Sequence, residues 1–549
     1  MDSLRHAPAL NSAPATFQRF PRLTAGLSAI AAGALAACGF QPLALWPLTI
    51  LGIALLAELV ARSDSGRRAF LAGWCFGVGH FALGNNWIAT AFTYQAQMPA
   101  WLGGISVVLI SLYLAVFPGL AALAGWRSLR GGAPFLALAL AFPAAWIVTE
   151  WMRAWAFTGF AWNPLGIALL GPFDTRGLAL LTPWIGTYGL SGVLVLLACL
   201  PGLFIRLGAA RSGLARWIWT APALAIAVPL VLVMTGPDRW ASRDEGQIRY
   251  TLVQPDLRQE VIDDPRQFEA NFVKLAMLSL PERSGDKRVV FWPESGLGDY
   301  LRDGYPPYLY RLYTYAGDPV LARERIGRVI GPHSLLLTGA VDLVMEDGDE
   351  VGARNTVTAF DGKGRILASY SKAHLVPYGE YLALRWLLEP LGARRLVAGS
   401  LDFWPGPGPR TYDFGSYGEA GVQICYEIVF SGEVVDPRNR PDYIFNPSND
   451  GWFGAWGPPQ HLAQARLRAI EEGLPVVRAT TTGISAVVDA DGIVRGHMPW
   501  RTAGRLDGRI PPPHQPTPFA RHGNALPLAL AGLLAALAVS VVALSRRRG

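Results

Sequence analysis

The sequence of 549 residues is poor in cysteine and in charge. It contains four cysteines, and no two of them form a Cys-x-x-Cys pair. So few cysteines in so long a chain do not make a disulfide framework, and nothing in their spacing indicates a zinc or redox centre. Charged residues make up only 16% of the chain, against about 25% in an ordinary soluble domain. This shortage argues against a purely water-soluble protein.

Several sequence signatures are also missing. The chain has no P-loop, no G-x-S-x-G serine elbow, no H-E-x-x-H motif and no Gly-rich dinucleotide fingerprint after a strand. The net charge of +7 does not indicate nucleic acid, because many of the positive residues are arginines in short clusters between apolar runs. We therefore expect no cofactor, no metal and no nucleic-acid partner.

Long apolar runs are what the sequence has in abundance. Hydrophobic residues make up 51% of the chain, and the mean hydropathy is +0.26. A membrane-spanning helix needs about 20 mostly apolar residues. The sequence predicts eight such spans, at 22–40, 44–61, 69–88, 101–125, 134–152, 179–205, 217–236 and 524–544.

Arginine in the short loops predicts the orientation of these spans. Arginines lie at or before the start of the first span and after the second, fourth, sixth and eighth, whereas loops 41–43 and 89–100 contain neither Lys nor Arg. Positively charged loops remain in the cytoplasm. Both chain ends are therefore predicted to be cytoplasmic, and the long segment between the last two spans lies on the other side.

That long segment has the pattern of an α/β domain. Short apolar strand candidates end in polar turns, as in "KRVVFWPES" and "GVQICYE", and helical patterns such as "QHLAQARLRAIEEGLP" lie between them. We expect three parts: a transmembrane domain of seven spans at 1–236, a catalytic domain at 240–510, and a linker with the last membrane helix at 511–549.

Three strand ends in this domain carry reactive side chains. Glu294 follows "VVFWP", Lys372 follows "ILASYS", and Cys425 follows "GVQI". A thiol is mostly protonated at neutral pH, so a nearby carboxylate can serve as its general base. A lysine ammonium stabilises the thiolate and a developing oxyanion. Base, cation and nucleophile together predict acyl transfer through a thioester.

These motifs resemble the nitrilase superfamily, and with the eight spans the chain is similar to its membrane-embedded branch, the apolipoprotein N-acyltransferases. The resemblance covers nearly the whole chain and includes "WPES", "SKAHLVPYGEY", "ICYE", "NPSNDGWFG", "FGVGHFALGNNWIA" and "FTGFAWNPLG". It implies a four-layer α-β-β-α sandwich beside a polytopic helical membrane domain. It also implies a bacterial inner-membrane enzyme whose catalytic domain is periplasmic.

The resemblance further implies a two-step reaction. A phospholipid is the acyl donor to Cys425, and the α-amino group of S-diacylglyceryl-cysteine at the N-terminus of an apolipoprotein is the acceptor. Glu294 is then the base and Lys372 the stabilising cation. Further supporting or substrate-binding positions are Glu380, Tyr426, Glu427, Asn449, Asp450 and Trp452. The family often has a Trp after the first strand of this domain, and "QPDLRQEVIDD" has none, which leaves any acyl-chain contact there open.

Other interpretations remain at this point. Cys425 alone fits a buried small hydrophobe, and His374 offers a Cys–His pairing instead. His80, Asn85 and Asn86 in the third span fit either a functional site or helix-to-helix hydrogen bonds. Glu150 and Arg153 fit an ion pair or a lipid headgroup contact.

Two other functions also remain open. The set of Glu294, Lys372 and Cys425 suits a membrane-anchored nitrilase or amidase that passes the acyl group to water. A degenerate domain of this kind suits a non-enzymatic scaffold.

Overall fold

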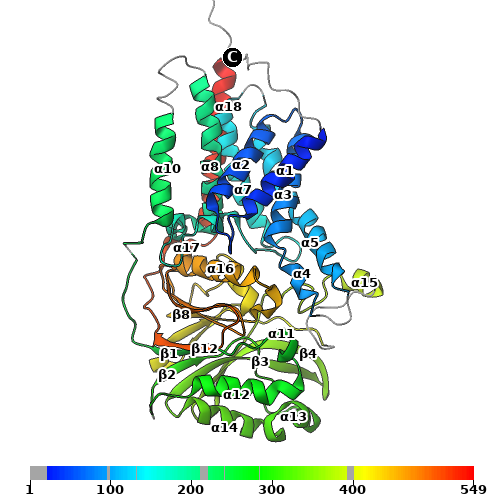
Figure 1. The fold of residues 1–549 in the computed structure, drawn as a ribbon, viewed down its shortest axis with the longest axis vertical. Coiled ribbons are helices and arrows are strands. Elements are labelled where there is room, and N and C mark those ends of the chain that lie inside the picture. Colours follow the sequence, from blue (N-terminus) through cyan, green and yellow to red (C-terminus); the bar gives the residue numbers. More distant parts are fainter. Residues whose placement is uncertain are drawn as a thin grey trace, which may run out of the picture.

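The computed structural model describes residues 22–94, 99–130, 133–209, 220–239, 241–283, 285–391 and 401–548. The molecule has two parts along its long axis, a bundle of helices at one end and two β-sheets with their helices at the other (Figure 1). The last helix returns to the bundle, so the sheet part is inserted between helices of one membrane domain. The helices of the bundle are α1 (Arg22–Ala37), α2 (Trp46–Ala61), α3 (Gly66–Gly84), α4 (Ile88–Ala91), α5 (Trp101–Leu114), α6 (Val116–Arg127), α7 (Phe135–Arg153), α8 (Thr182–Ala209), α10 (Thr220–Thr235) and α18 (Ala525–Arg548).

Four stretches of helix are long and apolar enough to cross a membrane. They are Trp101–Arg127, Phe135–Arg153, Leu178–Arg206 and Ala525–Arg547, and shorter apolar helices occupy Thr24–Ala37, Trp46–Ala61 and Ala225–Thr235. Each coincides with a predicted span. The remaining predicted span coincides with α3, whose mean hydropathy is lowered by glycines, two arginines and a histidine. With this many apolar helices, the chain is a multi-pass membrane protein.

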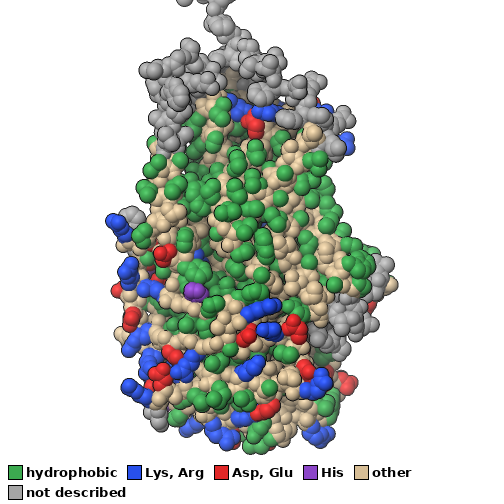
Figure 2. Space-filling model, in the orientation of Figure 1, with side chains coloured by type: hydrophobic (Ala, Val, Ile, Leu, Met, Phe, Trp, Pro, Cys, Tyr) green, Lys and Arg blue, Asp and Glu red, His purple; other side chains and the backbone are tan. Residues whose placement is uncertain are grey.

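The surface of the bundle agrees with that conclusion. Figure 2 shows hydrophobic side chains covering the bundle on this face, whereas charged side chains gather over the sheets and near the opposite end of the helices. Leu109, Leu232 and Val539 are exposed on three different helices. Apolar side chains that point outward from a helical bundle are expected where lipid replaces water.

Glycines let the bundle helices approach one another closely. A Cβ atom built on Gly79 would lie 2.0 Å from the backbone oxygen of Ile30, and one built on Gly33 would lie 1.9 Å from that of Phe76. Small residues at such contacts increase the van der Waals contact between helices in a membrane, where the hydrophobic effect contributes little. The contact between α1 and α3 therefore depends on these two positions.

The sheet part contains two six-stranded mixed sheets of the same plan. The strand order is β12-β1-β2-β3-β4-β5 in the first sheet and β11-β10-β9-β8-β7-β6 in the second. In each, three parallel strands are flanked by antiparallel ones. The strands are β1 (Arg249–Gln254), β2 (Arg288–Phe291), β3 (Ser334–Glu346), β4 (Asp349–Asp361), β5 (Ile366–Ser371), β6 (Thr411–Asp413), β7 (Glu419–Val422), β8 (Tyr443–Ser448), β9 (Val476–Thr480), β10 (Ser485–Val488), β11 (Val494–Met498) and β12 (Gly504–Arg509).

The two sheets pack face to face, and helices cover their outer faces. The rings of Phe291 and Phe445, one from each sheet, lie 4.9 Å apart. Alternate residues of a strand point to opposite faces, so Phe291 joins the core between the sheets while Val290 packs under the outer helices. Those outer helices are α12 (Phe268–Ser279) and α14 (Pro319–Ile330), with the short α11 (Gln259–Ile262), α13 (Pro307–Tyr313) and α15 (Arg385–Leu388) nearby in sequence.

Helix α16 (Gly457–Glu472) lies between the second sheet and the bundle (Figure 1). Leu462, Ala465 and Ala469 belong to the core that contains the sheets. Leu467 and Ile470 belong instead to the core of the membrane helices. Helix α16 therefore has two buried faces. The next helix in the chain, α17 (Pro518–His522), comes after β12 and before α18.

We predict that Gly79→Ala lowers the thermal stability of the detergent-solubilised protein. The added methyl group must push α1 away from α3, and such overpacking typically costs about 1–3 kcal/mol. Gly104→Ala is the matched control, because a Cβ atom at that bundle glycine meets nothing within 4 Å. The midpoint of thermal unfolding should fall for Gly79→Ala alone; equal midpoints would contradict this account of the packing.

Candidate active site

The three predicted reactive residues come together at the ends of their strands. Glu294 follows β2, Lys372 follows β5 directly, and Cys425 is the first residue of a short 3-10 turn, η7 (Cys425–Val429), after β7. β2 and β5 belong to the first sheet and β7 to the second. Because the sheets face each other, the ends of these strands meet in the gap between them.

A buried cluster of charges surrounds Lys372. Its Nζ atom lies 3.3 Å from Oε1 of Glu294 and 3.0 Å from Oε1 of Glu380. The side-chain amide of Asn355 donates to the same two oxygens, at 2.8 and 2.9 Å. All four side chains are buried. One ammonium group is thus compensated by two carboxylates, which a single amide holds in place.

The charge on Lys372 follows from these contacts. Burial by itself lowers the pKa of a lysine, but Glu380 and then Glu294 outweigh it and raise the pKa of Lys372 above its ordinary value. A lysine whose pKa is raised in this way stays protonated throughout the neutral range. Lys372 is therefore a fixed cation in the site.

Cys425 lies deep in the same site. Only 4% of the residue is exposed, and burial together with the Glu294 charge raises the pKa of its thiol well above the ordinary value, although Lys372 lowers it. The thiol is therefore protonated at rest, and its use as a nucleophile requires a base within reach. The charge of Glu294 acts directly on this thiol, as expected for such a base.

Glu427 holds the chain beside the cysteine. The Glu427 carboxylate accepts hydrogen bonds from the backbone N–H of Ile424 at 2.7 Å and of Ala373 at 2.7 Å, and from the Tyr370 hydroxyl at 2.8 Å. Burial raises the pKa of Glu427. It therefore ties the residue before Cys425 to the residue after Lys372.

The segment after β8 contacts the other side of the site. The backbone N–H of Asn449 donates to Oε2 of Glu294 at 2.7 Å. Asp450, the first residue of η8 (Asp450–Phe453), is fully buried and pairs with Arg478. Trp452 lies farther out, where its ring makes an edge contact with Tyr94 at 5.9 Å. Of the three predicted residues, Asn449 therefore touches the candidate base directly.

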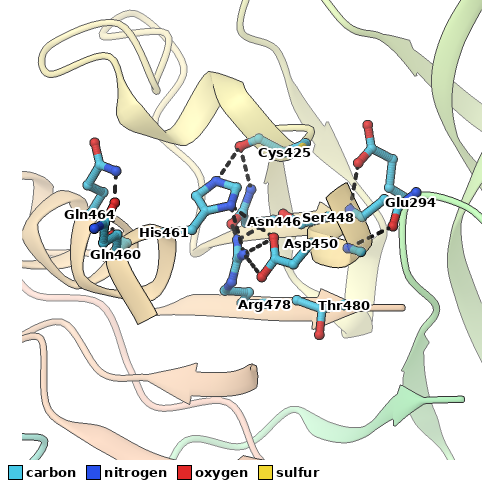
Figure 3. Close-up of polar contacts among 12 residues, drawn as sticks. Glu294, Cys425, Asn446, Ser448, Asp450, Gln460, His461, Gln464, Arg478 and Thr480 are labelled. Carbon is cyan, nitrogen blue, oxygen red and sulfur yellow. Dashed lines mark hydrogen bonds and ion pairs between the residues drawn. The ribbon is translucent and has the colours of Figure 1, made fainter. Parts of the chain in front are cut away.

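Sequence reasoning missed several buried polar residues of the site. Asn355 lies inside strand β4, where a polar residue in an alternating pattern gives no specific signal. His461 and Arg478 lie behind Asp450 (Figure 3). His461 is inside the helical pattern "QHLAQARLRAIEEGLP", so the pattern placed it on a helix without assigning it a role.

His374 does not form the alternative Cys–His pair. Its Nε2 atom lies 3.3 Å from Glu433, and its ring stacks on Phe430 at 4.3 Å between centroids. The side chain is 41% exposed, whereas Cys425 is buried. The geometry therefore favours Glu294 over His374 as the base.

The membrane-domain motifs lie directly against this site. The Tyr426 hydroxyl donates to the backbone oxygen of Gly159 at 3.4 Å, in the segment "FTGFAWNPLG". Of the two interpretations of Glu150 and Arg153, the structure has the ion pair, at 3.9 Å, and both residues are buried. Arg153 also donates to the backbone oxygen of Trp162 at 2.9 Å. The loop after α7 is thereby fixed beneath Tyr426.

Comparisons with known proteins show which families this chain is similar to. A family model described as the apolipoprotein N-acyltransferase N-terminal domain matches residues 32–200, and one described as carbon-nitrogen hydrolase matches 251–513. An apolipoprotein N-acyltransferase of Rhodopseudomonas palustris is 34% identical over 94% of this chain and 95% of its own length. One of Caulobacter vibrioides is 33% identical over 91% and 92%. Among solved structures, an amidase from Nesterenkonia sp. is 18% identical, with a TM-score of 0.33, over 52% of this chain and 96% of its own.

Two facing mixed sheets with the matched carbon-nitrogen hydrolase region define a nitrilase-like domain carried on a helical membrane region. The full-length similarity is more specific, and the chain belongs to the apolipoprotein N-acyltransferase family. The resemblance inferred from the motifs is thereby confirmed, and the protein is an enzyme of the acyltransferase class.

We predict how the buried charges around Lys372 affect stability, and a double variant tests this. In Lys372→Met, two buried carboxylates lose their cation, and breaking a buried pair in this way costs about 3–5 kcal/mol. Glu380→Gln in the same chain should restore part of the lost stability, because it removes one of the two uncompensated charges. Unfolding midpoints of the single and double variants measure this, and a double variant less stable than Lys372→Met would contradict it.

The stability loss of Lys372→Met should also depend on pH, and it should become smaller as the pH falls. A proton can replace the missing cation between two carboxylates, so the stability loss of Lys372→Met should be smaller at about pH 5 than at about pH 8. Unfolding midpoints of Lys372→Met and wild type at the two pH values test the sign; a loss that grows as the pH falls would contradict it.

Proposed function

We propose that this chain transfers an acyl chain from a membrane phospholipid to the N-terminal α-amino group of S-diacylglyceryl-cysteine in an apolipoprotein, through a thioester on Cys425. The observation that carries the proposal is the buried Glu294–Lys372–Cys425 constellation in a chain that belongs to this family. The apolipoprotein acceptor follows from the name that the relatives carry, and the phospholipid donor is what the resemblance of the motifs implies.

In the first step the Cys425 sulfur attacks the ester carbonyl carbon of the phospholipid. Glu294 takes the thiol proton, and the Lys372 ammonium stabilises the negative charge on the former carbonyl oxygen. The backbone N–H of Tyr426 is a second donor, because the first N–H groups of a helical turn have no partner within the turn. The ester C–O bond then breaks, Glu294 returns the proton to the departing oxygen, and a lysophospholipid leaves.

In the second step the acceptor amine attacks the thioester carbonyl carbon. Glu294 takes a proton from the amine nitrogen, the amide bond forms, and the C–S bond breaks. Lys372 stabilises the departing thiolate, which is then protonated again. Glu380 and Asn355 keep Lys372 and Glu294 in position through both steps. Glu380 accepts from the Lys372 ammonium, and the Asn355 amide donates to both Glu294 and Glu380.

Transfer instead of hydrolysis requires that water be kept from the thioester. Cys425 and Tyr426 are both buried, and Tyr426 packs against Trp162 of the membrane region, with ring centroids 6.5 Å apart. A site enclosed by the bundle is suited to two substrates that both carry acyl chains. These contacts favour transfer over the membrane-anchored nitrilase or amidase, which uses the same three residues on a water-soluble substrate.

We further propose the finer architecture that the sequence indicates. Eight spans cross the bacterial inner membrane with both termini in the cytoplasm. The periplasmic catalytic domain at 240–510 is a four-layer α-β-β-α sandwich between a transmembrane domain at 1–236 and a final segment at 511–549. The proposal is supported by the order in the structure, in which α12 and α14 cover one sheet and α16 the other.

A labelled phospholipid tests the reaction. Purified protein in detergent is incubated with a phospholipid that carries a labelled acyl chain, digested and examined by mass spectrometry. We expect label on the Cys425 peptide, release by neutral hydroxylamine, and rapid discharge by a diacylglyceryl-cysteine peptide. Cys425→Ser and Glu294→Gln should lose the thioester label, whereas Cys199→Ser, at a buried cysteine of the bundle, should keep it.

The other outcomes separate the alternatives. Label that water discharges as quickly as the amine peptide does would favour the hydrolase. A folded wild-type protein with accessible phospholipid and no label on Cys425 would overturn the proposed reaction and favour the scaffold.

The proposed topology is tested separately with impermeant thiol reagents. Single cysteines are placed at Arg62 and Lys363 in a chain whose four natural cysteines are serine, and both positions lie on described exposed or turn segments. The reagent should label the cysteine at 363 in cells whose outer membrane is permeabilised, and the cysteine at 62 only after the inner membrane is disrupted. The reverse pattern would overturn the orientation.

A further inference from the structure

Cys425 has an unusual backbone conformation. Its φ angle is +51°, in the left-handed region that residues with a side chain rarely adopt, at a cost of about 1–2 kcal/mol. Such a conformation persists only where the surrounding structure enforces it. The contacts that enforce it at the nucleophile therefore bear on the reaction.

Two side chains hold the backbone carbonyl of Cys425. Nε2 of His461, from helix α16, lies 3.0 Å from this oxygen, and the amide of Asn446, from strand β8, donates to it at 3.4 Å. A carbonyl oxygen only accepts hydrogen bonds, so Nε2 of His461 must carry the hydrogen. Burial and the Arg478 charge lower the pKa of His461, and the ring is neutral with its other nitrogen free to accept.

Arg478, from strand β9, connects both of these side chains. It lies 2.9 Å from Nδ1 of His461 and donates to Oδ1 of Asn446. It also binds both carboxylate oxygens of Asp450, at 2.8 and 2.7 Å, and Asp450 Oδ1 lies 3.0 Å from the same His461 nitrogen (Figure 3). These side chains are completely buried. The carbonyl of the nucleophile is thus held by one continuous polar network.

This network hydrogen-bonds to Cys425 through its backbone. His461 and Asn446 contact the carbonyl oxygen, and Arg478 and Asp450 lie one contact farther away. The network also reaches the candidate base, because Asn449, the residue before Asp450, donates its N–H to Glu294. An ionised Asp450 and Arg478 in a fully buried place cost desolvation energy that tight pairing must offset. An apolar core would fill this space at lower cost, so a positioning role accounts for the charges.

We propose that His461, held by Arg478, which Asp450 orients in turn, is a positioning residue that locks Cys425 in its left-handed conformation and thereby aims the thiol at Glu294 and Lys372. A trans peptide places its C=O and N–H on opposite sides. Fixing the Cys425 carbonyl therefore also fixes the direction of the Tyr426 N–H, the second donor for the oxyanion. The role in acyl transfer rests on the proposed function, whereas the conformation of Cys425 does not.

Three variants at one position test the proposal. His461→Ala removes the hydrogen bond to the Cys425 carbonyl, and His461→Asn carries an amide that is too short to reach it. His461→Gln places an amide N–H about where Nε2 lies. Two rates are measured on each detergent-solubilised full-length variant: alkylation of Cys425 by iodoacetamide, and single-turnover acylation by a labelled phospholipid, both read on the Cys425 peptide by mass spectrometry.

We expect both rates to fall about 10- to 100-fold in His461→Ala and His461→Asn, because small displacements of reacting groups cost rates of this size. His461→Gln should stay within about threefold of wild type on the same scale. The phospholipid concentration that gives half the maximal acylation rate should stay unchanged in all variants, because the side chains of the network are completely buried.

Arg466→Met is the control for a purely structural defect. Arg466 lies on the same helix, is equally buried, and donates to the backbone oxygens of Gly492 and Gly171 at 2.7 and 2.8 Å. Its loss should lower the unfolding midpoint while both rates stay near wild type. If His461→Ala does not fold, His461→Asn takes its place with the same expectation.

Each result decides the question. The positioning role is overturned if His461→Asn or a folded His461→Ala reacts at the wild-type rate, if His461→Gln is as slow as they are, or if Arg466→Met is equally slow. If wild type is alkylated but never acylated, the proposed reaction fails, and the alkylation rates alone decide the role of His461.

Discussion

The site depends on how a buried ammonium group is kept charged. Lys372 is almost completely removed from water, and a lone cation in such a place would lose its proton or disrupt the fold. Glu294 and Glu380 prevent this by lying on either side of it. Burial and the negative charge of Glu294 raise the pKa of the Cys425 thiol more than Lys372 lowers it. The Cys425 thiol is therefore protonated at rest.

The charge cluster in turn explains the surrounding hydrogen bonds. Oε1 of Glu294 accepts from Asn355 and its Oε2 accepts from the N–H of Asn449. Glu380 accepts from the backbone N–H of Val376 at 2.8 Å as well as from Asn355. Each carboxylate is fixed in direction, since buried charges are tolerated only when hydrogen-bonded. Glu294 and Lys372 consequently have little freedom to move.

Helix α16 joins the chemistry to the membrane. One of its faces packs on the second sheet and another on the membrane helices. Gln460 on this helix accepts from Trp162 at 2.9 Å and donates to the backbone oxygen of Gln41 at 3.0 Å, both in the helical region. His461, the next residue, reaches the Cys425 carbonyl. Neighbouring residues of one helix thus hold the membrane domain and the nucleophile.

The sequence by itself determined the class of the protein and indicated its candidate reactive residues. Apolar runs are visible because a span must be about 20 residues long, and "WPES", "YSKAH" and "ICYE" mark strand ends because buried strands stop abruptly at polar residues. The helices at 268–279 and 457–472 were visible from their periodicity. Weaker elements such as β6 and β12 were not, since edge strands of mixed polarity have no distinctive pattern.

Only the tertiary structure decided which polar residues support the three reactive ones. Asn355 lies 61 positions from Glu294, and His461 and Arg478 lie 36 and 53 positions from Cys425. Their roles arise from distances across two sheets and a helix. The left-handed backbone of Cys425 was equally invisible, because no glycine marks it. Local sequence sets which side chains are present, whereas packing sets which of them are buried together, and burial gives a charge or a hydrogen bond its strength.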